Sequence, residues 1–226
     1  MPLTFDELAE RLDGVKFMSA AQARRLWRYI DEHDARDVLD IGTCYGASAA
    51  WAAGALAVRG GGTVLTVDSA QFDDLSSARE WAHEVWDRCA VRSLISEERI
   101  TCSSYAWWLL EQADARRGRD GRVTPAWDLV YLDGAKSLTL DGTAAMLLLD
   151  LIRPGGCLLL DDVGWSYAGH DTGFGLRFGE FEYQASQAEL ERPHVRAVCE
   201  ALLRHDPRVA RLEYEGDWAR VTLASR

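Results

Sequence analysis

Four residues in the second half of the chain combine types and spacing that are suited to chemistry. Asp133 and Lys136 are separated by two small residues, and Asp161 and Asp162 are adjacent; Asp133 and Asp161 each follow an apolar run. If these runs are neighbouring strands of one sheet, their ends lie about 5 Å apart, which brings three carboxylates together. Two like charges about 4 Å apart repel by roughly 4 kcal/mol at an effective dielectric of 20, so three ionised carboxylates need compensation.

That compensation has two forms: one carboxylate takes up a proton, or a hard cation lies among the three. Ligands that are all oxygen favour Mg²⁺, Mn²⁺ or Ca²⁺ over zinc. We therefore predict a metal site formed by Asp133, Asp161 and Asp162. The alternative is that Asp161 or Asp162 only caps the turn after its strand.

The elements that position these residues begin with the segment Val38–Ser48. An apolar run is followed by Gly42-x-x-x-Gly46 and then by Ala47–Val58, a stretch of small residues typical of a tightly packed helix. Strand, glycine turn and helix form the first half of a nucleotide-binding unit, because glycines let the backbone approach a ligand and helix amides attract polar groups. An ordinary turn between a strand and a helix is the alternative.

The rest of the chain continues this alternation of strands and helices. Five strand–helix units and a closing pair of strands, joined too tightly for a parallel crossover, predict an α/β fold. We expect a Rossmann-like doubly wound sheet, mostly parallel with one antiparallel strand from a C-terminal hairpin, plus an N-terminal helical cap. The predicted helices are 5–12, 20–35, 47–58, 74–90, 105–115, 141–152, 184–191 and 193–204, and the predicted strands are 38–41, 63–67, 99–102, 127–132, 157–160, 209–214 and 218–223.

Residues 1–226 are expected to form a single domain. Residues 1–36 would hold the N-terminal helices, and residues 37–226 a Rossmann-like core with a lid loop at 163–180. In such sheets ligands bind beyond the carboxyl ends of the strands, so the glycine turn and the acidic residues would share one rim.

Asp68 and the glycine turn indicate the kind of cofactor. Asp68 ends the second predicted strand, where an acidic side chain can accept hydrogen bonds from both hydroxyls of a ribose; a solvated turn carboxylate is the alternative. A dinucleotide fingerprint requires Gly-x-Gly-x-x-Gly, with a middle glycine that makes space for the pyrophosphate. Cys44 stands at that position, and no Walker lysine follows. A nucleoside without phosphates therefore fits better than NAD(P).

Taken together, these segments resemble the class I S-adenosylmethionine-dependent methyltransferases. More narrowly, they resemble the divalent-metal-dependent O-methyltransferases of the catechol and caffeoyl-coenzyme-A type and their bacterial natural-product relatives. The resemblance covers about residues 37–165, and the closing hairpin agrees in topology. It is carried by Val38–Ser48, Asp68, Asp133-x-x-Lys136 and Gly155-Gly156-x-x-x-x-Asp161-Asp162-x-x-Trp165.

The resemblance implies an enzyme that transfers the methyl group of S-adenosylmethionine to a hydroxyl of a small molecule with neighbouring oxygens, assisted by a divalent metal. Metal-dependent relatives often have Asn where Asp162 stands, and the extra charge should tighten metal binding. The glycine that the family has within residues 102–105 is missing here, and Ser104 is our choice for the adenine contact. The residues that the resemblance assigns to the cofactor are Asp40, Gly42, Thr43, Gly46, Ser48, Asp68, Ser104 and Asp133.

The same resemblance makes Lys136, together with Asp133, the catalytic pair, with Lys136 as the general base. The chain's 25 basic residues include only two lysines, so a lysine at this position is not expected by chance. A surface lysine is the alternative reading, and His170 is the reserve base. Trp165 and His170 belong to a segment rich in glycine and aromatic residues that is expected to bind the substrate; aromatic packing under a structural loop is as consistent with it.

Net charge, cysteine content and the lengths of apolar runs restrict the cellular location and the binding partners that we expect for the protein. A net charge of −11 disfavours nucleic acid and anionic membrane surfaces as partners. Five scattered cysteines without a Cys-x-x-Cys pair fit reduced thiols. No apolar run approaches the roughly 20 residues of a membrane span, and the first residues lack a basic-then-apolar signal pattern. We expect a cytoplasmic enzyme with a small-molecule substrate; the oligomeric state is left open, a homodimer included.

Three other functions remain as alternatives. The first is a metal-independent methyltransferase that uses the same cofactor on nitrogen or on a peptide side chain. The second is an NAD(P) oxidoreductase, which Cys44 argues against. The third is a non-catalytic scaffold, which gains nothing from the clustered charges of Asp133, Lys136, Asp161 and Asp162.

Overall fold

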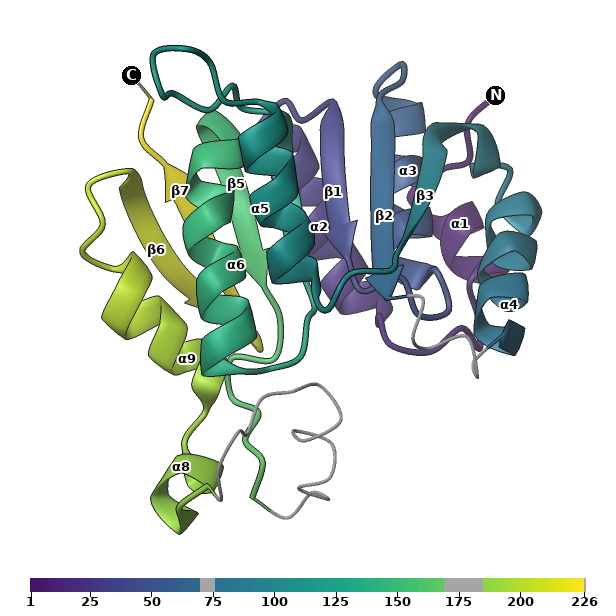
Figure 1. Ribbon diagram of the computed structural model, residues 1–226. Helices are drawn as coiled ribbons and strands as arrows, with labels where there is room; N and C mark the ends of the chain where they lie inside the picture. Colours follow the sequence, from purple (N-terminus) through teal and green to yellow (C-terminus); the bar gives the residue numbers. More distant parts are fainter. Residues whose placement is uncertain (70–75, 169–184, 226) are drawn as a thin grey trace. The chain divides into compact units, whose positions relative to one another are not determined.

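The structure is a computed structural model that describes residues 1–69, 76–168 and 185–225 (Figure 1). Its helices are α1 (Phe5–Arg11), α2 (Ala20–Glu32), α3 (Ala47–Val58), α4 (Ser76–Arg88), the 3₁₀ turn η2 (Arg92–Leu94), α5 (Tyr105–Ala115), α6 (Leu138–Leu151), α8 (Gln187–Glu191), α9 (His194–Val198) and the π-helical turn η3 (Cys199–Leu203). Its strands are β1 (Asp37–Ile41), β2 (Thr63–Ser69), β3 (Ile95–Ile100), β4 (Trp127–Leu132), β5 (Ile152–Leu160), β6 (Val209–Glu215) and β7 (Trp218–Leu223).

The strands form a seven-stranded sheet in the order β3-β2-β1-β4-β5-β7-β6. β1 pairs with β2, and β2 with β3, in parallel, whereas β7 is antiparallel to both β5 and β6. The predicted fold class is therefore confirmed, including the closing hairpin. Among the described residues, no helix is both long enough and apolar enough to cross a membrane.

The chain divides into two compact units, which are described separately below. Unit 1 comprises residues 1–103 and 126–130, and unit 2 comprises residues 104–125 and 131–226. The expectation of a single domain over 1–226 stays a prediction.

Unit 1 is built around the parallel strands β1, β2 and β3 and the helix α3 (Figure 1). α3 consists almost entirely of small, buried side chains, so neighbouring helices pack close to its backbone. The Trp27 indole of α2 donates a hydrogen bond of 2.8 Å to the carbonyl oxygen of Trp51, and a Cβ at Gly54 would overlap Leu8 of α1. The two N-terminal helices therefore pack against α3.

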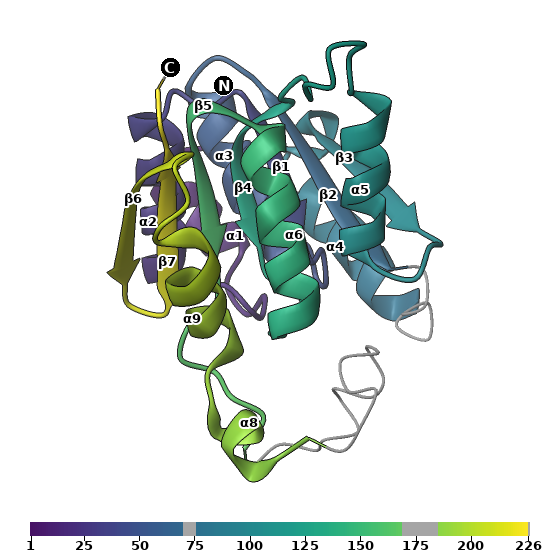
Figure 2. The same ribbon diagram turned by 60° about the vertical axis from the view of Figure 1, so that its left-hand side comes forward.

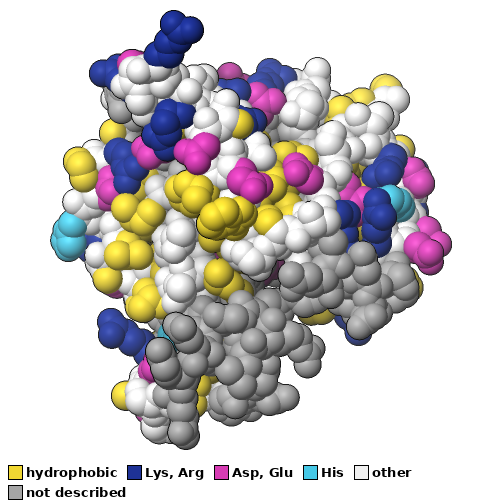
Figure 3. Space-filling view, in the orientation of Figure 1, with side chains coloured by type: hydrophobic (Ala, Val, Ile, Leu, Met, Phe, Trp, Pro, Cys, Tyr) yellow, Lys and Arg dark blue, Asp and Glu magenta, His cyan; other side chains and the backbone are white. Residues whose placement is uncertain are grey.

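Unit 2 contains the end of β4, the strands β5, β7 and β6, and the helices from α5 onwards. Figure 2 shows α6 and α9 next to each other, and their contact is part of the unit's core. Residues 157–160 of β5 pair with 219–222 of β7, and these β5 residues are buried. The face shown in Figure 3 has yellow apolar side chains among charged ones. Among the described residues of this unit, the large exposed apolar side chains are Trp107, Leu138 and Leu202.

Several element boundaries differ from the sequence prediction; β5, for example, begins at Ile152 and not at residue 157. β3 spans Ile95–Ile100, whereas 99–102 was predicted; the prediction failed because the central residues of the strand are charged and hide its pattern. β3 stands first in the strand order and is therefore an edge strand, where charged side chains are common. α6 begins at Leu138, one turn before Asp141, because the hydroxyl of Ser137 accepts a hydrogen bond of 2.8 Å from the amide of Leu140 and caps the helix.

Candidate functional site

Three carboxylates of unit 2 gather at the ends of two strands. Asp133 directly follows β4, and Asp161 and Asp162 directly follow β5. The amide of Asp161 donates a hydrogen bond of 3.1 Å to the carbonyl oxygen of Leu132, which joins the two strand ends. One carboxylate oxygen of each of the three aspartates lies within 4.8 Å of the others. The structure thus brings together the three residues that the sequence suggests as metal ligands.

The three carboxylates differ in their surroundings. Asp161 is 5% exposed, and burial raises the pKa of its carboxyl, with the neighbouring charge of Asp162 acting in the same direction. The Tyr131 hydroxyl donates a hydrogen bond to Asp161 Oδ2, and the Asp162 amide donates one of 2.7 Å to Asp161 Oδ1. Sequence reasoning did not identify Tyr131. It lies two residues before Asp133, and residues two apart in a strand point to the same face of the sheet. This spacing is the signal that could have identified it.

Lys136 lies beside these carboxylates. Its ammonium forms ion pairs with Asp133 and, at 3.3 Å, with Asp162 Oδ2, while its side chain is only 14% exposed. Lys136 has a φ of +60°, and Asp162 has a φ of +55°. This left-handed conformation costs a non-glycine residue roughly 1–3 kcal/mol and is concentrated at functional sites. The reading of Lys136 as an exposed surface lysine does not agree with these contacts.

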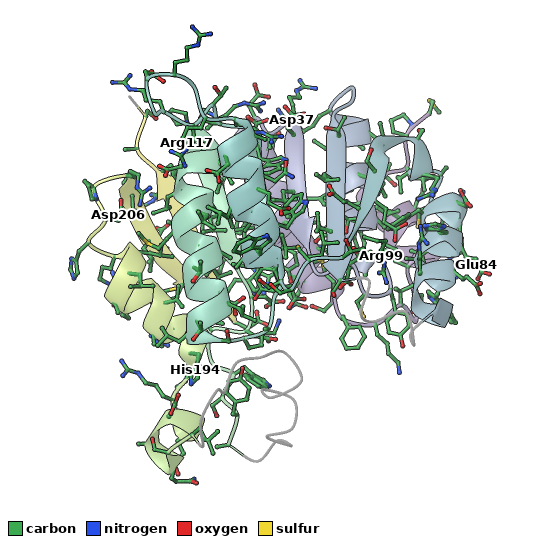
Figure 4. All side chains as sticks on the ribbon, in the orientation of Figure 1. Asp37, Glu84, Arg99, Arg117, His194 and Asp206 are labelled. Atoms are coloured by element: carbon green, nitrogen blue, oxygen red, sulfur yellow. The ribbon has the colours of Figure 1, made fainter. Side chains whose placement is uncertain are left out.

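Side chains from later segments hold the loop after β4. Tyr167 is buried, and its hydroxyl donates a hydrogen bond of 3.2 Å to the carbonyl oxygen of Ala135. His194, labelled in Figure 4 at the start of α9, accepts a hydrogen bond of 3.3 Å from the amide of Leu138 through Nδ1, and its Nε2 lies 3.0 Å from the carbonyl oxygen of Glu189. Because a carbonyl oxygen can only accept, Nε2 carries the proton and Nδ1 does not. Sequence reasoning missed His194, since it belongs to no motif, whereas Tyr167 belongs to the aromatic-rich segment that was expected to bind the substrate.

In unit 1, the glycine turn of the sequence motif lies between β1 and α3. Gly46 has a φ of +77° and precedes α3, and the indole of Trp86 donates a hydrogen bond of 2.9 Å to its carbonyl oxygen. A Cβ at Gly46 would lie 2.6 Å from Trp86 Nε1. Gly46 is therefore required by both its backbone conformation and its close neighbour. Gly42 lies at the start of the same turn, and its amide donates to the carbonyl oxygen of Val67 at 2.9 Å.

Asp40 lies beneath this turn in a chain of buried hydroxyl groups. The Thr66 hydroxyl donates a hydrogen bond of 2.7 Å to Asp40 Oδ2, so the 2.7 Å contact between the Thr43 and Thr66 hydroxyls must use the proton of Thr43. Asp40 Oδ1 is buried without a hydrogen-bond partner among the residues that the structure describes. Burial raises the pKa of Asp40 to about 7, although the hydroxyls of Thr66 and Ser48 act in the opposite direction.

Asp68 connects the end of β2 to the glycine turn. Its Oδ2 accepts a hydrogen bond of 3.1 Å from the amide of Cys44, and its Oδ1 accepts one of 2.8 Å from the amide of Ser69. Cys44 has a φ of +41°. Asp40, Gly42, Thr43, Gly46, Ser48 and Asp68 thus all lie in unit 1, on or next to one turn.

The remaining predicted residues have more varied positions. Ser104 caps α5, where its Oγ accepts a hydrogen bond of 3.2 Å from the amide of Trp107. Trp165 is partly buried and forms an edge contact with Tyr167, at 4.7 Å between ring centroids. His170 and most of the predicted lid loop lie outside the described residues.

The polar side chains of each unit can be compared with the metal ion or cofactor that they would bind. Three carboxylates with oxygens within 4.8 Å of one another suit a hard divalent cation. In unit 1, the unpartnered buried oxygen of Asp40 suits an ammonium group, and the carboxylate of Asp68 suits a pair of hydroxyls. Both donor sets therefore fit the predicted metal and cofactor.

Comparisons with known proteins identify the family of the chain. The family model described as a methyltransferase domain matches residues 39–163, more than half of the chain. No curated protein sequence matches the chain significantly.

Solved structures share the fold over almost the whole chain. The O-methyltransferase TomG from Streptomyces achromogenes, involved in tomaymycin synthesis and solved with S-adenosylmethionine, is 20% identical with a TM-score of 0.62, covering 98% of this chain and 89% of its own. An O-methyltransferase from Bacillus cereus in complex with S-adenosylhomocysteine is 18% identical with a TM-score of 0.60, covering 96% and 90%. The methyltransferase PaMTH1 of Podospora anserina, also bound to S-adenosylhomocysteine, is 15% identical with a TM-score of 0.63, covering 100% and 89%. These likenesses confirm the fold that the family resemblance implies.

Proposed function

Because the chain belongs to the methyltransferase-domain family, we propose that it is an S-adenosylmethionine-dependent O-methyltransferase. Its substrate would be a small molecule with two neighbouring oxygens, and a divalent metal, with Mg²⁺ as the first choice, would assist the transfer. The observation that carries this proposal is the group of Asp133, Asp161 and Asp162 with Lys136 paired to two of them. O-methyltransferases among the structural neighbours, solved with S-adenosylmethionine or S-adenosylhomocysteine, support the same reaction.

The metal would be held by Asp133, Asp161 and Asp162. A bound divalent cation would supply Lewis acidity, which makes a substrate hydroxyl easier to deprotonate. Tyr131 orients Asp161 by donating a hydrogen bond to one of its oxygens, and such supporting hydrogen bonds fix the direction of a ligand carboxylate.

The cofactor would be held by the turn between β1 and α3. Asp40 would accept a hydrogen bond from the ammonium group of the methionine part, and Asp68 would accept from the ribose hydroxyls. Gly42 and Gly46 keep the turn compact. The Thr43 hydroxyl hydrogen-bonds that of Thr66, which donates to Asp40, and the Ser48 hydroxyl also interacts with Asp40. Ser104 and Asp133 are further cofactor contacts that we propose from the family resemblance.

Lys136 would act as the general base of the transfer. The substrate oxygen forms a bond to the methyl carbon while the bond from that carbon to the sulfonium sulfur breaks. The sulfur would leave as a neutral thioether. Lys136 would first release its own ammonium proton to solvent and then, as the neutral amine, take up the hydroxyl proton. Its position beside Asp133 and Asp162 would hold its Nζ near a substrate oxygen bound at these carboxylates. Trp165, and His170 outside the described residues, are the proposed substrate contacts.

The protein is proposed to act in the cytoplasm. Its five cysteines are present as thiols, and Cys89, Cys157 and Cys199 are buried, as suits a reducing compartment.

Removal of divalent metal is the direct test of this function. The purified protein would be treated with EDTA and assayed with radiolabelled S-adenosylmethionine against a panel of catechols and hydroxylated acids. We expect turnover to fall at least about 100-fold and to return when Mg²⁺ is added in excess. Activity that persists in EDTA would favour the metal-independent methyltransferase instead, and stabilisation by NAD rather than S-adenosylhomocysteine in a thermal-shift assay would favour the oxidoreductase.

The affinity for the cofactor is expected to depend on pH through Asp40. With a pKa of about 7, Asp40 is largely protonated below pH 7 and cannot pair with an ammonium group. The affinity for S-adenosylhomocysteine, measured by calorimetry, should therefore fall by up to about tenfold per pH unit below 7 and level off above it. In Asp40→Asn the affinity should be weaker and its pH dependence between 6 and 8 should disappear.

Thermal unfolding provides the control for that variant. Because the folded pKa of Asp40 is raised, its carboxyl favours the folded state at low pH, and this contribution is lost as the pH rises from near 4 to about 7. Asp40→Asn should lack this part of the decline in Tm. A variant that binds S-adenosylhomocysteine like the wild type at pH 8 would remove Asp40 from the proposed cofactor site.

A further inference from the structure

Lys136 lies in a strained backbone conformation that its own side-chain contacts do not explain. Its φ is +60°, in the left-handed region, although it is not a glycine. Such a conformation persists where the surroundings hold the peptide groups on both sides of the residue. The peptide group after Lys136 contains the amide N–H of Ser137, and the amide N–H of Ala135 lies one residue before that of Lys136. The hydrogen-bond acceptors of these two amides therefore show what holds the backbone around Lys136.

Both amides donate hydrogen bonds to one pair of side chains, Tyr105 and Asp141. The amide of Ala135 donates a hydrogen bond of 3.0 Å to the hydroxyl oxygen of Tyr105, on α5. That hydroxyl donates its own proton to Asp141 Oδ1, on α6. The other oxygen of Asp141, Oδ2, accepts a hydrogen bond of 2.8 Å from the amide of Ser137. Tyr105 and Asp141 thus bind the chain immediately before and immediately after Lys136.

The pair is closely fitted, with Asp141 buried and Tyr105 partly buried. Asp141 is 2% exposed and Ser137 is fully buried, so solvent competes little for the hydrogen bond between them. Gly134 packs directly against the pair: a Cβ there would lie 2.5 Å from the Tyr105 hydroxyl oxygen and closer still to Asp141 Oδ1. The glycine in Asp133-Gly134-Ala135-Lys136 therefore leaves room for Tyr105 and Asp141.

We propose that Tyr105 and Asp141 are positioning residues for the methyl transfer: they fix the backbone on both sides of Lys136 and so hold its Nζ in place between Asp133 and Asp162. Neither residue touches the reacting atoms. Removal of the Tyr105 hydroxyl or the Asp141 carboxylate would leave Asp133 at the end of β4 but would allow the loop that follows β4 to move. The part of this inference that concerns turnover rests on the proposed function of Lys136 as the base.

Tyr105→Phe tests the proposal with a minimal change. We expect the Ala135 amide, followed by NMR hydrogen exchange, to exchange at least about tenfold faster, because its acceptor is gone. We expect acylation of Lys136 at a fixed pH, measured by mass spectrometry, to rise at least about threefold relative to exposed Lys16, because local opening exposes the amine. Asp141→Asn keeps the shape but has a single acceptor oxygen, so the Ser137 amide should respond as well.

Kinetics separate positioning from a merely structural role. In Tyr105→Phe, kcat with Mg²⁺ and catechol should fall between about tenfold and 100-fold, while KM for S-adenosylmethionine stays within about twofold. With 4-nitrocatechol, which is already ionised at neutral pH and needs no base, the loss in kcat should be much smaller.

The matched control is Tyr214→Phe, which removes a hydroxyl that donates to the Glu200 carboxylate at 2.6 Å in the same unit. It should leave exchange, acylation and kcat unchanged. Unchanged exchange and acylation in a folded Tyr105→Phe would overturn the proposal whether or not the wild type is active. Altered exchange with equal losses of kcat on both catechols would overturn the link to the base. A wild type inactive on both catechols would contradict the proposed function, while exchange and acylation still decide whether the pair holds Lys136.

Discussion

Asp161→Ala is expected to remove metal-dependent turnover while the protein stays folded and binds S-adenosylhomocysteine normally. Asp161 is the most buried of the three carboxylates, and its oxygens lie within 4.8 Å of those of Asp133 and Asp162. With two carboxylates left, a divalent cation loses a charged ligand, and the Lewis acidity that it supplies to the reaction is worth several kcal/mol, or about 10³-fold in rate. Initial rates at saturating S-adenosylmethionine over a range of Mg²⁺ concentrations measure the effect.

Two further measurements make this result specific. Mg²⁺ should raise the Tm of the wild type and leave that of Asp161→Ala unchanged, since ligands stabilise only a state that binds them. Asp150→Ala is the matched control, because Asp150 is an exposed carboxylate of the same unit that pairs with Arg208 at 2.8 Å; its rate and its response to Mg²⁺ should equal those of the wild type. Wild-type turnover in Asp161→Ala would end the metal proposal.

Lys136→Met is expected to lower kcat by about 10²- to 10⁴-fold, the range that general-base catalysis contributes. Methionine keeps the length and the apolar stem of lysine but cannot take up a proton. Because Lys136 belongs to the proposed reaction centre of unit 2 and not to the glycine turn, KM for S-adenosylmethionine should change little. Full kinetics against both substrates measure this split between kcat and KM.

Lys16→Met is a matched control that this chain offers by its composition. Lys16 is the other lysine, and it is exposed. The two variants therefore make the same chemical change at a proposed catalytic position and at a solvated one. Equal rates for Lys136→Met and Lys16→Met would place the base elsewhere, and a variant of His170 would then be the next to measure. A rise in KM for S-adenosylmethionine with an unchanged kcat would instead assign Lys136 to binding.

Local signals explain why so much of the fold was readable. The glycine turn before α3 and the small residues of α3 are consecutive in the chain, and the helix was predicted with the bounds Ala47–Val58 that it has. Thr4 and Ser19 precede the first two helices, and each forms a capping box with the residue three positions on, which is also a local pattern. β3 was misplaced because the charges of an edge strand mask its pattern.

The amino-acid sequence by itself determined the candidate reaction centre: Asp133, Lys136, Asp161 and Asp162 follow two apolar strands, and strand adjacency is enough to predict that their side chains meet. Only the tertiary structure decided which side chains form the hydrogen bonds that hold these four residues in position. Tyr131 and Asp161 are 30 residues apart, and Tyr105 and Asp141 are 36 apart. A hydrogen bond of that span depends on how strands and helices pack, which no local pattern encodes. Residue type and spacing thus predict the proposed reacting groups, and packing selects the side chains that contact them.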